Sequence, residues 1–394
     1  MPVSPYRLLT LGHSYVVRAN RALAQALQRV GGERWQVRVV APDYFHGTRD
    51  LRPVYFQAAT HEAYEVRVVP AYGTRWVHWF VYDWSQLRRA MQGHWDIIHV
   101  WEEPYIVAGA ELAAAAPRRA RFVFRTAQSV RSWYPPPFCW LERYTLQRAA
   151  GWICSGQLVA RHLQQRAEYA RKPMALIPLG VDTERFAPQP AQRITIRRQL
   201  GWTSDDPPVV GFLGRLTEEK GIRILLQVLD ALRVSWRALI IGAGPLETEV
   251  RRWAAPYGSQ RVQLCTHVSH DDVPSYLNAM DLLVAPSQTT PRWKEQFGRM
   301  VIEAMACGIP VVGSDSGEIP YVIGDAGRIV PEKDVDQWIQ ILEQLLQDVV
   351  LRRELAQAGR QRVLTHYTWP HIAQQHLDFF TRLLEEGTTQ CRVS

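Results

Sequence analysis

Glu295-Gln296-Phe297-Gly298-Arg299-Met300-Val301-Ile302-Glu303 lies between two short apolar runs, residues 282–285 and 311–313. The stretch leads into residues 301–306, whose composition predicts a helix. We therefore expect a strand, a loop that carries Glu295, a helix that carries Glu303, and a second strand. Two parallel strands joined through a helix form one βαβ unit, which favours a parallel sheet covered by helices.

The same alternation extends along the whole chain. In the first half we expect strands at residues 8–11, 36–40, 64–69, 97–101, 122–125 and 152–154, with helices at 21–29 and 109–115. In the second half we expect strands at residues 209–213, 238–241, 262–265, 282–285, 311–313 and 328–330. This pattern predicts an α/β protein made of two Rossmann-like, doubly wound parallel-sheet domains that face each other across a cleft.

The length of 394 residues also suits two domains rather than one core. A Pro-rich connector at residues 177–190 places the boundary near residue 180, so we expect domains at 1–180 and 181–369. Near the end of the chain, residues 372–384 have the spacing of an amphipathic helix.

Composition narrows the class of protein. Hydrophobic residues make up 47% and charged residues 21%, as in a soluble globular protein. We find no apolar run that could cross a bilayer and no secretory signal pattern. The five cysteines are scattered, which favours reduced thiols. We expect a cytoplasmic protein, either free or peripheral on the inner face of the cell membrane.

Charge is concentrated in the first half. Residues 1–180 contain 23 Lys and Arg against 12 Asp and Glu. An anionic partner such as a membrane surface, a lipid phosphate or nucleic acid would explain this excess, and so would a general preference for arginine. No helix-turn-helix, RNP or zinc motif accompanies the charge, which argues against nucleic acid.

Two cations follow the predicted strand at 209–213. Gly214 ends that strand, and Arg215 and Lys220 lie in the loop before the next helix. Ligands of open α/β sheets bind at the carboxyl ends of strands, and these cations could hold a diphosphate. The alternative is a solvated helix start in which Glu218 and Glu219 neutralise both charges.

Gly242 and Gly244 follow the strand at 238–241 in a pattern close to the dinucleotide fingerprint. The third glycine of that fingerprint would fall at Glu247, so an NAD site is disfavoured. The glycines suit either close approach of a phosphate or sugar, or a plain tight turn. Asp334-Val335-Asp336 is more simply a helix start with Asp334 as N-cap than a metal site, and we expect no metal.

Taken together, these segments resemble the retaining GT-B glycosyltransferases of family four, also called glycosyltransferases group 1. The segments that carry the resemblance are residues 178–182, 211–221, 242–245, 285–287, 295–303 and 308–318. The resemblance implies a metal-independent transferase without a cofactor, with a nucleotide-sugar as co-substrate. It also implies that a terminal helix, residues 370–388, crosses back onto the first domain.

By this resemblance, Arg215 and Lys220 hold the donor diphosphate and Glu303 holds the ribose hydroxyls. Glu295, with the amides of Phe297, Gly298 and Arg299, holds the sugar and the distal phosphate. The remaining donor contacts implied are those of Gly214, Gly242, Gly244, His267, Val268 and Gly12.

The first half departs from the family pattern. Phe124-Arg125-Thr126 stands where the family often has a histidine, so Arg125 would replace that histidine near the sugar or acceptor. The loop Gly12-His13-Ser14 lacks the usual run of glycines, which leaves Gly12 as a single phosphate contact.

Residues 131–144 mix arginine with aromatic side chains, including Trp133 and Trp140. One interpretation is a segment that docks on an anionic membrane and presents a lipid-linked acceptor. The other is a helix whose aromatic residues pack into the domain.

From these residues we expect a retaining glycosyltransferase that uses a UDP- or GDP-sugar and a glycan or lipid-linked acceptor, in cell-envelope or exopolysaccharide biosynthesis. The alternative is a catalytically silent subunit on the same fold that binds nucleotide-sugars and acts as a regulator or partner.

Overall fold

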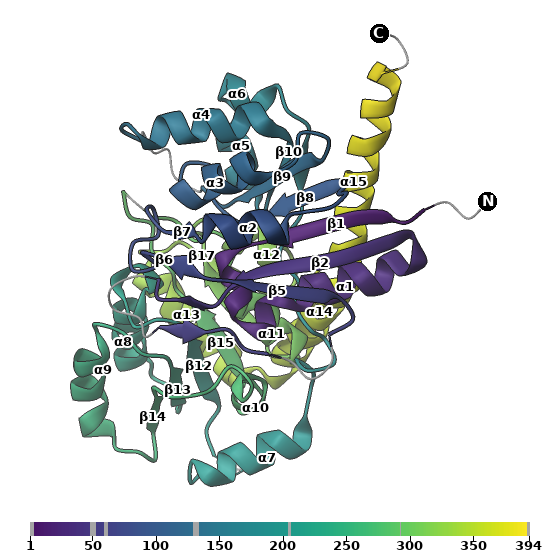
Figure 1. Cartoon of the computed structure of the whole chain (residues 1–394). Helices are drawn as coiled ribbons and strands as arrows, with labels where there is room; N and C mark the ends of the chain where they lie inside the picture. The colour runs from purple at the N-terminus through teal and green to yellow at the C-terminus, as the bar shows by residue number, and fades with distance from the viewer. Residues whose placement is uncertain are drawn as a thin grey trace. The chain divides into compact units, whose positions relative to one another are not determined.

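The computed structural model describes residues 4–47, 53–58, 62–128, 134–203, 206–291 and 293–391. The chain separates into two compact units, Met1–Gly180 with Trp369–Ser394, and Val181–Thr368. Each unit is built on one parallel sheet with helices around it (Figure 1). The predicted fold class, two Rossmann-like α/β sheets, is confirmed.

The sheet of the first unit has the order β11-β10-β9-β8-β1-β2-β5. Its strands are β1 (Tyr6–Leu11), β2 (Trp35–Pro42), β5 (Glu65–Val69), β8 (Ile97–Val100), β9 (Arg121–Thr126), β10 (Ala149–Cys154) and β11 (Met174–Leu176). The chain builds outward from β1 to one side and then returns to add β8 on the other. The loops after β1 and β8 therefore diverge at a topological switch point, where ligands of such sheets bind.

Helices cover both faces of this first sheet because successive strand residues point to opposite sides. Leu9 and Ile98 pack with α2 (Trp84–Ala90), α3 (Val107–Ala115) and α5 (Gln157–Gln164). Leu8 and Ile97 pack with α1 (Ala22–Gly31) and α15 (Trp369–Cys391). Helix α15 lies beside α1, as Figure 1 shows in yellow and purple.

The remaining helices of this unit are α4 (Phe138–Arg148) and α6 (Ala167–Ala170). Two short antiparallel pairs join β3 (Tyr44–Phe45) to β4 (Val54–Tyr55) and β6 (Ala71–Tyr72) to β7 (Val81–Tyr82).

The sheet of the second unit has the order β14-β13-β12-β15-β16-β17. Its strands are β12 (Val209–Leu213), β13 (Arg237–Ile241), β14 (Val262–Cys265), β15 (Leu282–Ala285), β16 (Val311–Ser314) and β17 (Arg328–Val330). Its helices are α7 (Pro190–Gln199), α8 (Ile222–Ala231), α9 (Glu247–Ala254), α10 (Val273–Asn278), α11 (Arg299–Ala306), α12 (Ile319–Ile323), α13 (Val335–Gln347) and α14 (Val349–His366). The switch point of this sheet lies between β12 and β15.

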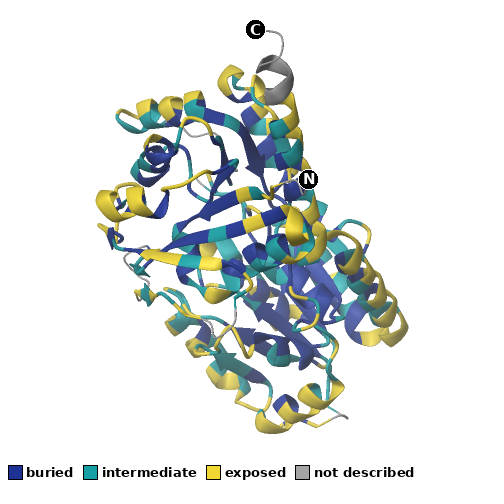
Figure 2. Ribbon diagram, turned by 45° about the vertical axis from the view of Figure 1, so that its right-hand side comes forward, coloured by how far each residue is buried: buried dark blue, intermediate teal, exposed yellow. Residues whose placement is uncertain are grey.

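Every strand predicted from the sequence is present, because buried parallel strands are short continuous apolar runs. Figure 2 shows these strands as mostly dark blue, which marks buried residues. The N-cap prediction is confirmed as well, since the Asp334 side chain accepts a hydrogen bond from Gln337 N at 3.0 Å. Helix α14 was not predicted from the sequence, because it buries only Leu355, Gly359 and Val363 and so lacks a strong apolar pattern.

Candidate functional site

Lys220 and Glu295 meet at the switch point of the second unit, although 75 residues separate them in the chain. Lys220 ends a 3-10 turn, Glu218–Lys220, in the loop after β12. Glu295 lies in the loop between β15 and α11. The two loops leave neighbouring strands, so their side chains can reach one another in front of the carboxyl edge of the sheet.

The contact between them is a short, shielded ion pair. Lys220 Nζ lies 2.6 Å from Glu295 Oε2, and the Ser287 hydroxyl donates to the same oxygen at 2.9 Å. The side chains are 16% and 8% exposed, so the attraction is less screened than on an open surface. Lys220 Nζ also lies 4.9 Å from the centre of the Trp293 ring. The pair is therefore held in one geometry before any ligand binds.

Glycines allow the loops of the pair to touch. Gly221 has φ +71°, and a Cβ there would lie 1.7 Å from the carbonyl oxygen of Pro286. Gly317 has φ +60°, and a Cβ there would lie 2.0 Å from the carbonyl oxygen of Glu295. Only glycine fits such close approaches at positive φ. The main chain at Glu295 is further fixed because Glu318 N donates to its carbonyl at 3.0 Å.

Helix α11 starts directly after Glu295. Gly298 is its N-cap with φ +81°, and no side chain caps the helix. The Phe297 ring is buried and packs edge-on against Tyr367 at 6.0 Å, so only the main chain of Phe297 can serve a ligand. A helix N-terminus attracts anions through its amides and its dipole. Arg299 opens this first turn.

Glu303 lies on the same helix and is buried. His270 Nε2 lies 3.8 Å from Glu303 Oε1, a contact that the sequence analysis did not identify. The predicted base contacts, His267 and Val268, lie just after β14; His267 is exposed and pairs with the Thr266 hydroxyl at 2.8 Å. The structure thus brings His270 to Glu303.

Arg215 does not join the Lys220–Glu295 pair in this structure. Its side chain is exposed, and its closest ionic partner is Glu219, with Nη2 3.4 Å from Oε1. The alternative considered from the sequence was that Glu218 and Glu219 neutralise both cations of this loop. The Arg215–Glu219 contact fits that alternative, whereas Lys220 pairs with Glu295. A long exposed arginine can change rotamer at little cost, so its position here does not limit its reach to a ligand.

Gly242 and Gly244, predicted as donor contacts, each lie so close to a neighbouring loop that a Cβ would clash with its main chain. A Cβ at Gly242 would lie 1.8 Å from the carbonyl oxygen of Gly214, and one at Gly244 would lie 2.5 Å from that of Leu216. The loop after β13 therefore packs directly on the loop after β12. This packing holds the start of the Arg215–Lys220 loop in place.

In the first unit, Gly12 and Arg125 both lie against Trp101. Gly12 is extended, and a Cβ there would lie 2.6 Å from Trp101 Cβ. Arg125 is buried, donates to the carbonyl of Ile177 at 3.0 Å and stacks over Trp101 at 4.4 Å. Its guanidinium is thus enclosed within the unit. Trp140 on α4 is 66% exposed, while Trp133 lies outside the described residues.

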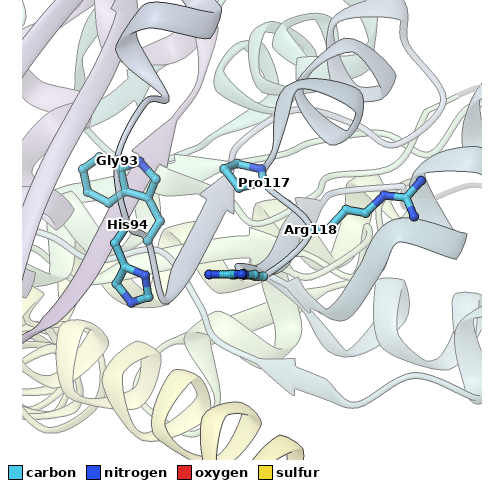
Figure 3. Close-up of a pocket in the computed structure, with 6 residues that line it drawn as sticks. Gly93, His94, Pro117 and Arg118 are labelled. Carbon is cyan, nitrogen blue, oxygen red and sulfur yellow. The ribbon is translucent and has the colours of Figure 1, made fainter.

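A separate cavity of about 450 Å³ lies at the amino ends of β8 and β9 (Figure 3). Its lining residues are Gly93, His94, Trp95, Pro117, Arg118 and Arg119. In Figure 3 the Arg118 side chain extends away from His94. The cavity lies at the edge of the sheet opposite the switch point, so we do not place the site there.

Over the described residues, no three His, Cys, Asp or Glu side chains are placed so that they could hold a metal ion. Over the same residues, no helix has both the length and the apolar character needed to span a bilayer.

Family models match both halves of the chain. Residues 16–185 match the model described as Glycosyltransferase Family 4, and residues 192–362 match the model described as Glycosyl transferases group 1.

Two curated relatives are similar in sequence. One is the GDP-mannose-dependent alpha-(1-6)-phosphatidylinositol monomannoside mannosyltransferase of Mycolicibacterium smegmatis, 32% identical over 72% of this chain and 76% of that protein. The other is the GDP-mannose-dependent monoacylated alpha-(1-6)-phosphatidylinositol monomannoside mannosyltransferase of Corynebacterium glutamicum, 34% identical over 50% of this chain and 54% of that protein. The chain thus spans about half the length of the second relative.

Among solved structures, HepE of Anabaena in complex with UDP and glucose superposes with a TM-score of 0.71. The match covers 96% of this chain and 100% of that one, at 19% identity. At that identity the likeness concerns the fold, which is GT-B.

Proposed function

The chain belongs to glycosyltransferase family four, and from that premise we propose that it is a retaining, metal-independent glycosyltransferase acting on a nucleotide-sugar and a lipid-linked or glycan acceptor. The observation that supports this most is the Lys220–Glu295 pair at the switch point of the second unit. The two curated relatives are named for GDP-mannose and for phosphatidylinositol mannosides. We therefore favour a GDP-sugar donor and a role in the cell envelope.

The proposed roles follow from the chemistry of each group. An ammonium group has three donors, and Lys220 uses one of them on Glu295, which leaves donors for a diphosphate. Among the described residues, Glu295 Oε1 makes no hydrogen bond, so it can accept from a sugar hydroxyl. Arg215 and the amides at the start of α11 add positive potential for the leaving group. Glu303 would accept from the ribose hydroxyls.

Stabilising the departing diphosphate is where such a site lowers the barrier most. As the bond between the anomeric carbon and the phosphate oxygen breaks, negative charge grows on that oxygen. The oxygen can then take the proton of the acceptor hydroxyl, which attacks from the same face and gives retention. This route needs no second carboxylate as nucleophile, unlike a retaining hydrolase.

The first test is a thermal-shift comparison of GDP-mannose, UDP-glucose and ADP-glucose. At about 100 times Kd a bound donor stabilises by about 2.7 kcal/mol, which raises Tm by roughly 5–10 °C for a domain of this size. We expect GDP-mannose to give the largest rise. Equal small shifts with all three would contradict the donor assignment. Binding without release of nucleoside diphosphate, across an acceptor panel, would instead support the silent subunit.

The lipid-linked acceptor is supported by an aromatic surface on the first unit. Trp76, Trp79 and Trp140 each have more than half of their side chain exposed. A hollow of about 500 Å³ is lined by residues 75–79, Tyr134, Pro135 and Phe138, so Arg75 and several aromatic residues share its lining. Exposed Trp and Arg together suit the interface of an anionic membrane.

We expect the double variant Trp79→Ala/Trp140→Ala to lose at least tenfold in binding to vesicles that contain phosphatidylglycerol, measured by sedimentation. The matched control is Ile194→Ala, which removes an exposed apolar side chain from the second unit. Unchanged sedimentation of the Trp double variant would remove the membrane from the proposal and leave the donor site untouched.

A further inference from the structure

A second pair of ionisable groups lies at the switch point of the first sheet. Leu11 and Val100 are direct neighbours in the β1–β8 register, so the loops after both strands leave the sheet together. His13 follows β1, and Glu102 follows β8. The two residues are 89 positions apart, and the sequence analysis assigned no role to either.

Glu102 holds His13 at two points. Glu102 Oε1 accepts from the main-chain N–H of His13 at 2.5 Å and from the Tyr82 hydroxyl at 3.1 Å. Glu102 Oε2 lies 2.5 Å from His13 Nδ1. A carboxylate accepts but does not donate, so Nδ1 carries the proton and Nε2 of the neutral ring is an acceptor. The partner therefore fixes the tautomer as well as the position.

The ring is rigid yet reachable. It stacks on Phe45 with centroids 4.4 Å apart and meets the edge of Phe80 at 5.7 Å. The His13 side chain is still 29% exposed, whereas Glu102 is fully enclosed. In the described part of the chain Nε2 makes no hydrogen bond. An oriented acceptor atom is thus presented at the edge of the sheet where ligands bind.

The local charges make this ring a stronger base, and its Nε2 accepts a hydrogen bond only at a pH above the pKa of the ring. Burial lowers the pKa of His13, but the Glu102 carboxylate and Glu103 more than offset this, so its pKa is raised above the usual value. Glu103 is fixed at the same edge, where Thr126 Oγ1 and Ala127 N donate to it at 2.6 and 2.7 Å. Burial raises the pKa of Glu103 to about 7.

Holding the loops after β1 and β8 together would not by itself require the His13–Glu102 pair. The loop after β1 is already fixed by the close packing of Gly12 on Trp101 and by the hydrogen bond from Trp101 N to Leu11 O at 2.7 Å. Neither contact needs an imidazole. The side-chain pair adds a fixed tautomer and an outward acceptor, which loop packing does not require.

We propose that His13, oriented by Glu102 and Tyr82, forms the acceptor-hydroxyl site of the first unit, with Nε2 accepting a hydrogen bond from a hydroxyl of a sugar or polyol acceptor. This inference rests on the proposed transferase function and specifies the acceptor side of it. It concerns a residue that stands in this chain where the family pattern has glycine.

The decisive variant is His13→Asn. Its amide N–H can still donate to Glu102, but it has no atom in place of Nε2. With GDP-mannose as donor and methyl α-mannoside as acceptor probe, we expect transfer to fall roughly 10-fold, as for loss of one positioning hydrogen bond. Hydrolysis of the donor by water and the Tm should stay within twofold and about 2 °C of wild type. The control is His94→Ala, which removes an exposed histidine paired with Asp96 at 3.2 Å and should change nothing.

Two results would overturn the inference: wild-type transfer by His13→Asn, or an equal fall in transfer and in donor hydrolysis. A second measurement does not depend on turnover. In protein with ¹⁵N-labelled histidine, methyl α-mannoside should shift the Nε2 resonance of His13 in wild type, and an unmoved resonance would also overturn it. A wild-type protein that neither hydrolyses nor transfers any nucleotide-sugar would instead overturn the proposed function.

Discussion

Glu295→Gln is expected to reduce sugar transfer by a factor of 100 or more while changing the affinity for the nucleoside diphosphate by less than threefold. The amide keeps the shape of the side chain and can still accept from Ser287, 2.9 Å away in the native protein. It loses the negative charge that, in our proposal, orients the sugar as positive charge develops on it. Interactions made mainly in the transition state affect rate more than binding, and losing one lowers the rate by a factor of about 10²–10³.

The measurements for this variant are steady-state transfer and calorimetric binding of GDP. Ser287→Ala is the matched control, because it removes one hydrogen bond from Glu295 Oε2 without removing the carboxylate. We expect that control to lose about 1 kcal/mol of stability and little rate. Turnover of Glu295→Gln within twofold of wild type would show that the carboxylate has another role.

Lys220→Ala is expected to weaken GDP binding and transfer together, each by a factor of roughly 10–100. A hydrogen bond to a charged group contributes about 1.5–3 kcal/mol, and in our proposal the diphosphate loses one in both the bound and the transition state. Calorimetry with GDP and steady-state kinetics measure the two effects. Lys333→Ala, which removes an exposed lysine, is the control and should leave both unchanged.

The double variant Lys220→Ala/Glu295→Gln separates the effect of Lys220 on GDP binding from its effect on the stability of the fold. Lys220→Ala alone leaves the enclosed Glu295 carboxylate without its cation at 2.6 Å, which should lower Tm. Adding Glu295→Gln removes the uncompensated charge, so Tm should recover while GDP affinity stays low. Recovery of GDP affinity in the double variant would mean that Lys220 acts on Glu295 and not on the phosphates.

Much of the fold could be predicted because its signals are local. Strands such as β12 and β15 are continuous apolar runs, and their bounds match the predicted ones. The segments around Arg215, Lys220, Glu295 and Glu303 were singled out because they follow strands in a fixed order. By contrast, α14 has few buried positions and β11 has three residues, so neither gave a clear pattern.

The sequence could not predict which side chains meet. It proposed Arg125 for the acceptor side, which stays a prediction, and the structure adds that this arginine stacks on Trp101. It proposed His267 and Val268 beside the base, which stays a prediction, and the structure adds that His270 approaches Glu303. The contact of Arg125 depends on which residues pack against β9, and that of His270 on how the loop after β14 folds, and no short motif describes either.

The amino-acid sequence by itself therefore determined the two parallel sheets, the order of their strands along the chain, and the loops that carry charge. Only the tertiary structure decided that Lys220 pairs with Glu295 and that His13 pairs with Glu102, across 75 and 89 residues. The physical reason is the separation along the chain over which each kind of interaction acts. Apolar periodicity depends on neighbours a few residues away, whereas an ion pair depends on which strands lie side by side at a switch point.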